Sequence, residues 1–440
     1  MDELDNTFWV VSADMGYGHM RAVAPFQHDA DGGLLAAGDN DLASDAERKL
    51  WRRYLRLYEI FSRAKGLPVV GKQLFSMLDS LLHIPSLYQI RNLSHSTFQV
   101  DALESQLKKG LGAGIARIIA AKPKPLLTSF YVPALVADKA GHQPIYCVIC
   151  DADLNRVWVA KDPWESNINY FAPCGKAAQR LRSYGVSDER IFLTGFPIDD
   201  ALLGGRDLTT LKHDLSIRLK VLDPTGRFHT LHGKSVEHFL GPNDAHPLPH
   251  ERVLTITYAV GGAGALTEIG TSLLETFKVR LKAGTMHLNL VAGTRPEVRD
   301  LFEAAKAKIV GIDASVSVIY APDLEGYFQA FNAAIRTTDI LWTKPSELSF
   351  YAGLGLPIIM TPTIGSQEKF NRKWLLEIGA GMRQEKPDYA SEWLFELLEN
   401  GRFADMAWLG FLRARKLGYH HILDVIRNGT FTRSDNPLQR

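Results

Sequence analysis

Residues 341–381 have the sequence LWTKPSELSFYAGLGLPIIMTPTIGSQEKFNRKWLLEIGAG, in which short apolar runs alternate with turns and helical segments. The pattern predicts a strand at 340–342, a helix that begins after Pro345, and a second buried strand at 356–360. A polar loop at 361–371 then leads into another helix. Strands separated by helices are typical of a parallel sheet, so this stretch predicts a doubly wound α/β fold.

The predicted loop carries Gln367, Glu368, Lys369 and Asn371, so hydrogen-bond donors and acceptors stand side by side in it. Loops that follow parallel strands lie at the carboxyl edge of the sheet, where doubly wound folds bind ligands. Such a loop suits a polyhydroxylated ligand such as a sugar. A solvated loop between two core strands has the same composition, and both interpretations stay open at this point.

The composition describes an ordinary soluble protein. The chain has 440 residues, too many for one hydrophobic core, so we expect two domains. Its net charge of +1 excludes the global field that attracts nucleic acid. No apolar run approaches the roughly 20 residues of a membrane span. The acidic N-terminus enters a strand at once and does not resemble a signal peptide, so we expect a cytoplasmic protein.

Each half of the chain begins with a strand, a glycine turn and a helix. In the first half the strand is 8–11 and the turn contains Gly16, Tyr17, Gly18 and His19. In the second half the strand is 253–260 and the turn contains Gly261, Gly262 and Gly264. Such turns let a phosphate approach the backbone at a helix N-terminus, although neither completes the G-x-G-x-x-G fingerprint. We expect two Rossmann-like domains, 1–200 and 201–415, and a C-terminal helix and tail at 416–440.

Several segments carry weaker predictions. Residues 29–46 have the composition of a loop, and the tail from 428 is polar and is expected to fray. Residues 204–250 include His229, His232, His238, His246 and His250, which lack metal-ligand spacing, so we expect a surface insertion and no metal site. Cys147 and Cys150 are three positions apart in one predicted strand and point to opposite faces, which favours buried thiols over a dithiol or zinc pair.

Asp151 and Asp153 follow the end of the predicted strand 145–150. This position places both carboxylates toward the cleft between the domains. A role as helix caps or turn formers explains the two aspartates equally well.

The segment 47–65 is an amphipathic helix with an apolar face and seven basic residues, and a second apolar segment extends to residue 87. One interpretation is peripheral contact of 47–87 with the inner, anionic face of a membrane, or a cleft for a lipid acceptor. The other is that these helices pack on the sheet with solvated arginines outside.

At this point the chain resembles a known group. Four motifs are similar to those of GT-B glycosyltransferases near monogalactosyldiacylglycerol synthase, processive diacylglycerol glucosyltransferases and the N-acetylglucosaminyltransferase of peptidoglycan synthesis. They are SADMGYGHMRA at 12–22, CDADLNRVW at 150–158, GGAGA at 261–265 and the run from 344 to 381. The resemblance implies two Rossmann-like domains that face each other across a cleft. It also implies a metal-independent inverting transfer, with a nucleotide sugar as co-substrate and no further cofactor.

The resemblance also implies site residues. His19 falls on the loop histidine, the proposed base, and Gly261, Gly262 and Gly264 fall on the diphosphate-binding turn. Gln367 and Glu368 fall on the pair that contacts the sugar, and Asn371 on the asparagine after it. The acceptor-side loop corresponds to Gly16, Tyr17, Gly18, Asp151 and Asp153.

The chain departs from the family pattern at four places. Tyr17 replaces the middle glycine of the first loop, and Asn155 stands where a second histidine is expected. The segment 344–357 is about two residues shorter than usual, so the ribose-binding glutamate aligns near Phe350. Glu347 lies one helical turn earlier and is the candidate replacement.

Three function classes follow. The first is an inverting transferase that moves a hexose or N-acetylhexosamine from a nucleotide-diphosphate sugar, with UDP as the expected nucleotide, to a hydroxyl acceptor. The second is a relative that does not transfer, either a sugar-nucleotide epimerase or an inactive binding protein. A nicotinamide-dependent oxidoreductase is the least favoured, because the glycine fingerprint is incomplete.

Overall fold

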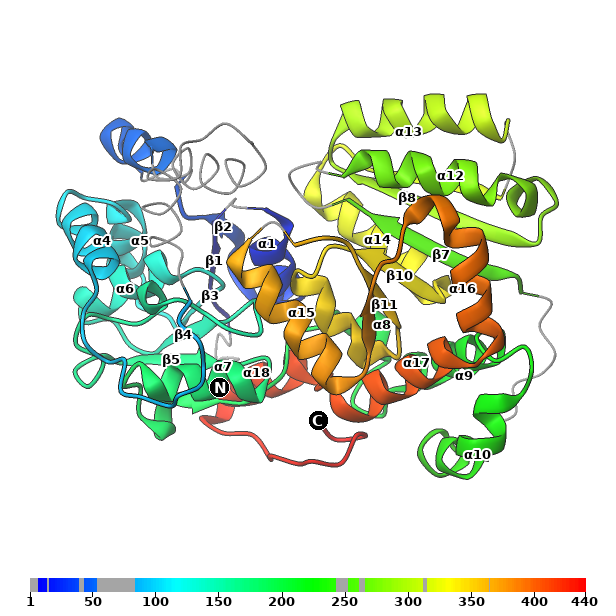
Figure 1. Ribbon diagram of the computed structural model, residues 1–440. Coiled ribbons are helices and arrows are strands. Elements are labelled where there is room, and N and C mark those ends of the chain that lie inside the picture. The colour runs from blue at the N-terminus through cyan, green and yellow to red at the C-terminus, as the bar shows by residue number, and fades with distance from the viewer. Residues whose placement is uncertain are drawn as a thin grey trace, which may run out of the picture.

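A computed structural model describes residues 7–13, 16–38, 43–53, 84–242, 252–260, 266–311, 315–363 and 365–440. Within these ranges the strands form two six-stranded sheets, and every pairing between strands of a sheet is parallel (Figure 1). Helices connect successive strands, as parallel pairing requires.

The first sheet has the order β2-β1-β3-β4-β5-β6. Its strands are β1 (Phe8–Ser12), β2 (Ala30–Ala36), β3 (Leu126–Thr128), β4 (Ile145–Val148), β5 (Ile168–Phe171) and β6 (Ile191–Phe192). The accompanying helices are α1 (Tyr17–Val23), α4 (Phe98–Lys108), α5 (Ala113–Ala121), α6 (Tyr131–Lys139) and α7 (Gly175–Ser183). Short 3₁₀ turns are η1 (Ala24–Asp29), η2 (Arg156–Trp158) and η3 (Asp188–Arg190).

The second sheet has the order β12-β11-β10-β7-β8-β9. Its strands are β7 (Leu254–Ala259), β8 (Met286–Gly293), β9 (Val316–Tyr320), β10 (Ile340–Thr343), β11 (Ile358–Met360) and β12 (Gly381–Arg383). Its helices are α8 (Asp200–Leu203), α9 (Thr209–Val221), α10 (Arg227–Leu240), α12 (Thr267–Lys282), α13 (Pro296–Ile309), α14 (Leu324–Thr337), α15 (Ser366–Ile378), α16 (Ala390–Glu399) and α17 (Arg402–Arg413), with the 3₁₀ segments η4 (Glu347–Leu354) and η5 (Pro387–Tyr389). In Figure 1, α12 and α13 lie side by side on one side of this sheet.

The last helix, α18 (Gly418–Asn428), returns to the first domain. His421 Nδ1 bonds the carbonyl of Thr194 at 3.0 Å, and the Tyr419 ring packs on Phe26 at 5.2 Å. The tail after α18 is docked, since Lys416 Nζ donates to Pro437 O at 2.8 Å and the backbone N–H of Lys416 donates to Arg440 O at 2.9 Å. The prediction of a frayed tail is wrong, because these bonds depend on partners that only the fold brings near.

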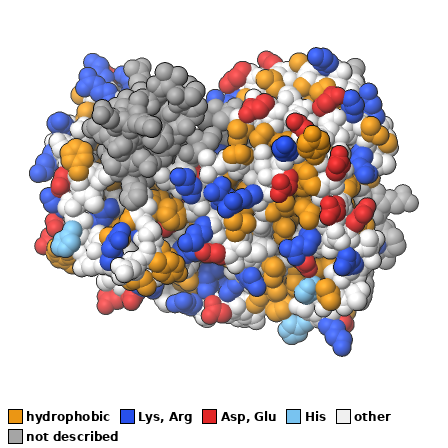
Figure 2. Space-filling model, viewed as in Figure 1, with side chains coloured by type: hydrophobic (Ala, Val, Ile, Leu, Met, Phe, Trp, Pro, Cys, Tyr) orange, Lys and Arg blue, Asp and Glu red, His pale blue; other side chains and the backbone are white. Residues whose placement is uncertain are grey.

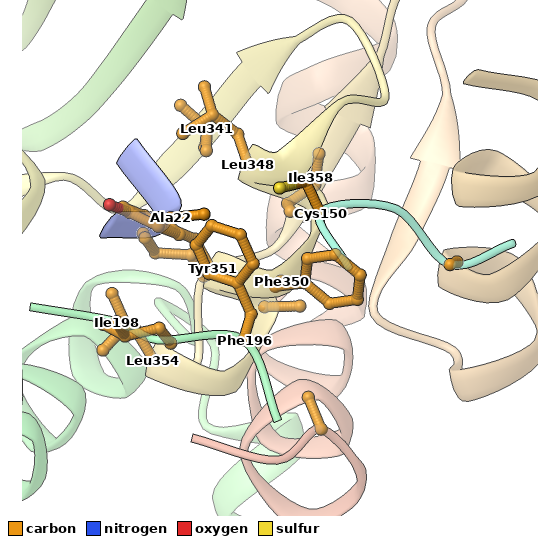
Figure 3. Close-up of a cluster of buried hydrophobic side chains, with 14 of the residues drawn as sticks. Ala22, Cys150, Phe196, Ile198, Leu341, Leu348, Phe350, Tyr351, Leu354 and Ile358 are labelled. Atoms are coloured by element: carbon orange, nitrogen blue, oxygen red, sulfur yellow. The ribbon is translucent and has the colours of Figure 1, made fainter. Parts of the chain in front are cut away.

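One hydrophobic core runs through both domains. Figure 3 shows part of it, where Ala22, Cys150 and Phe196 of the first domain lie among Leu348, Phe350 and Tyr351 of the second. The rings of Phe196 and Phe350 stack at 5.3 Å. The interface between the domains is therefore packed like the interior of a domain, and burial of apolar surface holds the two sheets together.

Three further predictions about elements need correction. Ala30–Ala36 within the predicted loop 29–46 form β2, an edge strand whose pairing with β1 overrides its weak local propensity. The predicted surface insertion 204–250 contains α9 and α10, and α9 buries Leu211, Leu215 and Leu219. The predicted loop 361–371 ends at Ser366, where α15 begins.

Candidate functional site

The candidate site lies where α1 meets the carboxyl edge of the first sheet. Gly16, with φ 108°, precedes the helix, and Tyr17 is its first residue. His19 in the first turn is half-buried, and its Nδ1 lies 2.7 Å from the carbonyl oxygen of Ser129, just after β3. The rings of Phe130 and Trp158 lie 5.3 and 6.0 Å from the imidazole. The imidazole is therefore held between two aromatic side chains and one backbone acceptor.

The hydrogen bond to the Ser129 carbonyl determines which imidazole nitrogen of His19 carries the proton. A carbonyl oxygen only accepts hydrogen bonds, so Nδ1 must donate and Nε2 keeps the lone pair. Burial lowers the pKa of His19, and the bond to Ser129 and the charge of Glu347 oppose this to a smaller extent. At neutral pH the ring is neutral, with Nε2 able to accept a proton.

Tyr17 and Gly18 join the first domain to the second. The Tyr17 hydroxyl accepts from the backbone N–H of Thr294 at 2.9 Å and lies 3.0 Å from Thr294 Oγ1. Gly293 permits this approach, because a Cβ added there would lie 2.4 Å from the tyrosine oxygen. A Cβ added at Gly18 would lie 3.0 Å from a carboxylate oxygen of Glu347. Tyr17 therefore contacts the second domain at the end of β8.

Glu347 contacts the first domain. Its Oε1 lies 3.4 Å from Nε of Arg21, and both side chains are buried. Arg21 also donates to the hydroxyl of Tyr327 on α14 at 3.0 Å. The carboxylate predicted to replace the ribose-binding glutamate is thus used in a buried ion pair between the domains, and Phe350 at the aligned position is buried in the core.

Asn371 bridges the domains as well. It is fully buried, and its amide donates to Asp151 Oδ1 at 2.7 Å and to the carbonyl of Pro345 at 3.2 Å. Its oxygen accepts from the N–H of Ala152 at 2.7 Å. Burial raises the pKa of Asp151 to about 6, against the opposing bond from Asn371. The amide nitrogen and oxygen of Asn371 therefore bond to other residues of the protein, whereas the sequence predicted that they would bind the donor sugar.

Asp153 does not reach the space between the domains. Both of its oxygens accept from Arg180 on α7, at 2.7 and 2.9 Å, and the two side chains are almost wholly buried. Oδ1 also accepts from the N–H of Leu154. A buried arginine partner thus holds this carboxylate inside the first domain.

Gln367 and Glu368 lie in the first turn of α15. Glu368 accepts from Lys344 Nζ at 3.2 Å and from the N–H of Gly365 at 3.3 Å, so it caps its own helix. Gln367 is half-buried beside it. The first turn of α15 therefore presents amide, carboxylate and ammonium groups together, next to the strand end of β10.

Some predicted features lie outside the described residues, namely the turn with Gly261, Gly262 and Gly264 and most of the segment 47–87. All three cysteines are buried and free, which confirms the expected buried thiols. Among the residues described, no group of three or more His, Cys, Asp or Glu side chains is placed to hold a metal. The same part of the chain contains no helix long and apolar enough to cross a membrane. Figure 2 shows acidic and basic side chains intermixed over the second domain.

Sequence reasoning missed four residues of this site: Arg21, Ser129, Trp158 and Thr294. Arg21 had a weak signal, because an arginine on the apolar side of a short helix must find a buried partner. The partners of the other three are more than one hundred residues away in the chain, and no local pattern marks them.

Comparisons with known proteins support the fold. Residues 297–407 match a family described as a domain of unknown function, DUF6938. No curated protein matches the chain. Among solved structures, MurG of Acinetobacter baumannii is 12% identical with a TM-score of 0.50, covering 96% of this chain and 99% of MurG.

Two further structures are less similar. A putative UDP-N-acetylglucosamine 2-epimerase from Listeria monocytogenes is 13% identical with a TM-score of 0.48, and 96% of each chain is covered. MnaA of S. aureus, solved with UDP, is 13% identical with a TM-score of 0.46, and 95% of each chain is covered. At these identities the likeness concerns the fold alone. The predicted fold, two Rossmann-like doubly wound domains in the GT-B arrangement, is confirmed.

Proposed function

We propose that this protein is a glycosyltransferase that moves a hexose or N-acetylhexosamine from a nucleotide-diphosphate sugar, a UDP-sugar in the first instance, to a hydroxyl acceptor. The observation that carries the proposal is the state of His19. Burial lowers the pKa of its imidazole and so favours the neutral form, the bond to Ser129 sets its tautomer, and it stands in the first turn of α1 at the carboxyl edge of the first sheet. A general base for an acceptor hydroxyl needs these properties.

In the proposed reaction the acceptor oxygen attacks the anomeric carbon, with inversion, as the bond to the diphosphate breaks. Nε2 of His19 takes the acceptor proton. The N-terminus of α12 (from Thr267), which follows the predicted glycine turn, supplies the positive end of a helix dipole for the departing diphosphate. No metal is required in this proposal, because fixed dipoles stabilise the developing charge.

The proposed sugar contacts are Gln367 and Glu368. Both lie in the first turn of α15, and Lys344 orients the carboxylate of Glu368. Carboxylate and amide groups side by side recognise adjacent hydroxyls of a hexose. Glu347 and Asn371 are not proposed as donor ligands, because they bind partners in the first domain.

The test is release of nucleoside diphosphate from UDP-sugars in the presence of a mixture of hydroxyl acceptors. His19→Ala should lower turnover by about 10²-fold or more and leave donor affinity unchanged, since the base acts only in the chemical step. His28→Ala is the matched control, because His28 is exposed on the neighbouring η1. Wild-type turnover in His19→Ala would remove this histidine from the mechanism.

A second candidate is a relative that binds or isomerises a nucleotide sugar without transfer. The observation that favours it is the replacement of the expected ribose-binding glutamate by buried Phe350, with Glu347 paired to Arg21. Incubation with a UDP-sugar and no acceptor separates the candidates. An isomerised sugar nucleotide indicates an epimerase, and binding without any product indicates an inactive relative.

A lipid acceptor on the inner face of a membrane is part of the proposal. Arg52 and Arg53 are exposed at the described start of the segment 47–87, and Tyr88 and Ile90 just beyond it are 65% and 70% exposed. Basic and apolar side chains together favour an anionic bilayer surface. The protein should sediment with anionic vesicles at low salt and be released by high salt. Failure to bind at low salt contradicts this part of the proposal.

A further inference from the structure

Helix α1 lies between the two domains, and its two faces contact different ones. In an α-helix residues four apart lie about 40° from each other around the axis, and residues two apart lie about 200° from each other. Tyr17 and Arg21 therefore share a face, and both contact the second domain. His19 lies on the opposite face and contacts Ser129 in the first domain.

The Arg21 side chain is enclosed by residues of the second domain. Its guanidinium carbon lies 4.4 Å from the ring centre of Phe331, 4.7 Å from that of Phe328, and 5.5 and 5.8 Å from those of Tyr327 and Tyr351. The cation thus sits over aromatic faces, an arrangement that is attractive when water is excluded. Only 4% of the residue is exposed.

The charge of Arg21 is balanced across the interface by Glu347 at 3.4 Å. A buried cation that lost its carboxylate would be strongly unfavourable, so the pair ties α1 to the start of η4. Arg21 thus brings a cation from the first domain into the interface, and the second domain supplies an anion and an aromatic enclosure for it.

Helix α1 needs such support. It has seven residues and no side-chain cap at its N-terminus. A helix of this length is not stable by itself, so tertiary contacts decide its position. On one face those contacts are Arg21 and Tyr17 with the second domain, and on the other they are His19 with Ser129 O and, at 3.7 Å, with Cys150 Sγ.

We propose that Arg21 is a positioning residue for His19. By inserting into the second domain it fixes α1, and this holds the imidazole against Ser129 with Nε2 oriented for proton transfer. The base is then correctly placed only while the two domains are packed together. The catalytic meaning of this inference rests on the proposed transferase function, whereas the placement of His19 does not.

The first experiment needs neither donor nor acceptor. The pKa of His19 is measured by NMR with labelled histidine, and its signal among the 14 histidines is identified by its absence in His19→Gln. Burial is the main cause of the lowered pKa of His19, and Cys150 and Glu347 are the titratable groups beside it. If α1 leaves its position, the imidazole gains water and its pKa rises toward the ordinary value near 6.5.

The comparison is between Glu347→Gln and the double variant Arg21→Ala/Glu347→Gln. Both lack the carboxylate that raises the pKa of His19, so they differ only in Arg21. We expect the pKa of His19 to be higher in the double variant than in Glu347→Gln. In Arg21→Lys the pKa of His19 should equal the wild-type value, because the lysine keeps a cation for Glu347 and the aromatic rings. Equal values in Glu347→Gln and the double variant would overturn the proposal.

Arg218→Ala is the matched control. Arg218 is also buried, but it donates to the carbonyls of Thr338 and Leu354 within the second domain. Its loss should lower thermal stability without moving the pKa of His19. If the double variant does not fold, Tyr17→Phe decides, because it removes only the bonds to Thr294. It should raise the pKa of His19 in the same direction by a smaller amount, and an unchanged value refutes the coupling.

The second experiment uses turnover. Arg21→Lys should retain most of kcat, while Arg21→Ala/Glu347→Gln should lower kcat about tenfold or more relative to Glu347→Gln with little change in the donor KM. In the double variant the acid limb of the pH profile of kcat should shift to higher pH, together with the pKa of His19. If wild-type protein has no turnover, the proposed function fails and the NMR comparison still decides the positioning role. A change in donor KM alone would instead make Arg21 a binding residue and reject the proposal.

Discussion

Asn371 offers the most direct measure of how the domains are joined. In Asn371→Leu the side chain keeps its approximate volume but loses three hydrogen bonds, to Asp151, Pro345 and Ala152. The N–H of Ala152 is fully buried and is left without an acceptor, which costs about 1–3 kcal/mol. Loss of a donor to the charged Asp151 adds about 1.5–3 kcal/mol.

Together these effects predict a loss of about 2.5–6 kcal/mol, toward the upper end for a single substitution. For a chain of 440 residues the unfolding entropy converts this loss of stability into a fall in Tm of about 3–6 °C. The assay is thermal unfolding followed by circular dichroism, with urea unfolding as the second probe.

Asn332→Leu is the matched control. Asn332 also bonds across the chain, from Nδ2 to Asp199 at 2.9 Å, but its own Oδ1 is buried without a partner among the described residues. The same substitution there removes one bond and also one unsatisfied oxygen, so its cost should stay below about 1.5 kcal/mol. Equal losses in the two variants would refute the view that Asn371 is a principal link between the domains.

Two further predictions concern stability. Because burial raises the pKa of Asp151 to about 6, the folded state carries a cost that is absent at low pH and grows as pH rises from about 4 to 6. Asp151→Asn removes this titration, so its free energy of unfolding in urea should rise relative to that of wild type between about pH 4 and 6. A difference in unfolding free energy that does not change with pH contradicts the prediction. Gly410→Ala places a Cβ 2.4 Å from the carbonyl oxygen of Ala352, so α17 must move away from η4 and stability should fall by about 3 kcal/mol or more. Gly175→Ala, where no atom lies within 4 Å of the added Cβ, should change Tm by less than about 1 °C, and similar Tm values for the two variants would refute the packing argument.

Local patterns in the sequence determined most of the elements. Strands such as β7, β9 and β10 lie where apolar runs and turn residues predict them, within one or two residues. The alternation of strands and helices along the chain was sufficient to predict parallel sheets and two Rossmann-like domains. These features depend on neighbours along the chain, and for that reason a sequence without a structure reveals them.

Elements whose sequences carry only weak local signals could be identified only from the tertiary structure. Ala30–Ala36 form a strand only because β1 offers a free edge. Helix α9 buries Leu211, Leu215 and Leu219, and its Arg218 donates to carbonyls more than one hundred residues away in the chain. The start of α15 at Ser366 is stabilised by Glu368, which caps its own helix, and composition alone does not mark such a boundary.

The site shows the same division. The sequence by itself determined that His19 stands where a glycine turn meets a helix and that Gln367 and Glu368 follow a strand. Only the tertiary structure decided that Glu347 pairs with Arg21 and that Asn371 bonds Asp151. These pairs are 326 and 220 residues apart in the chain. Their energy comes from burial and from mutual saturation of charges and hydrogen bonds, and neither exists until the two domains have packed.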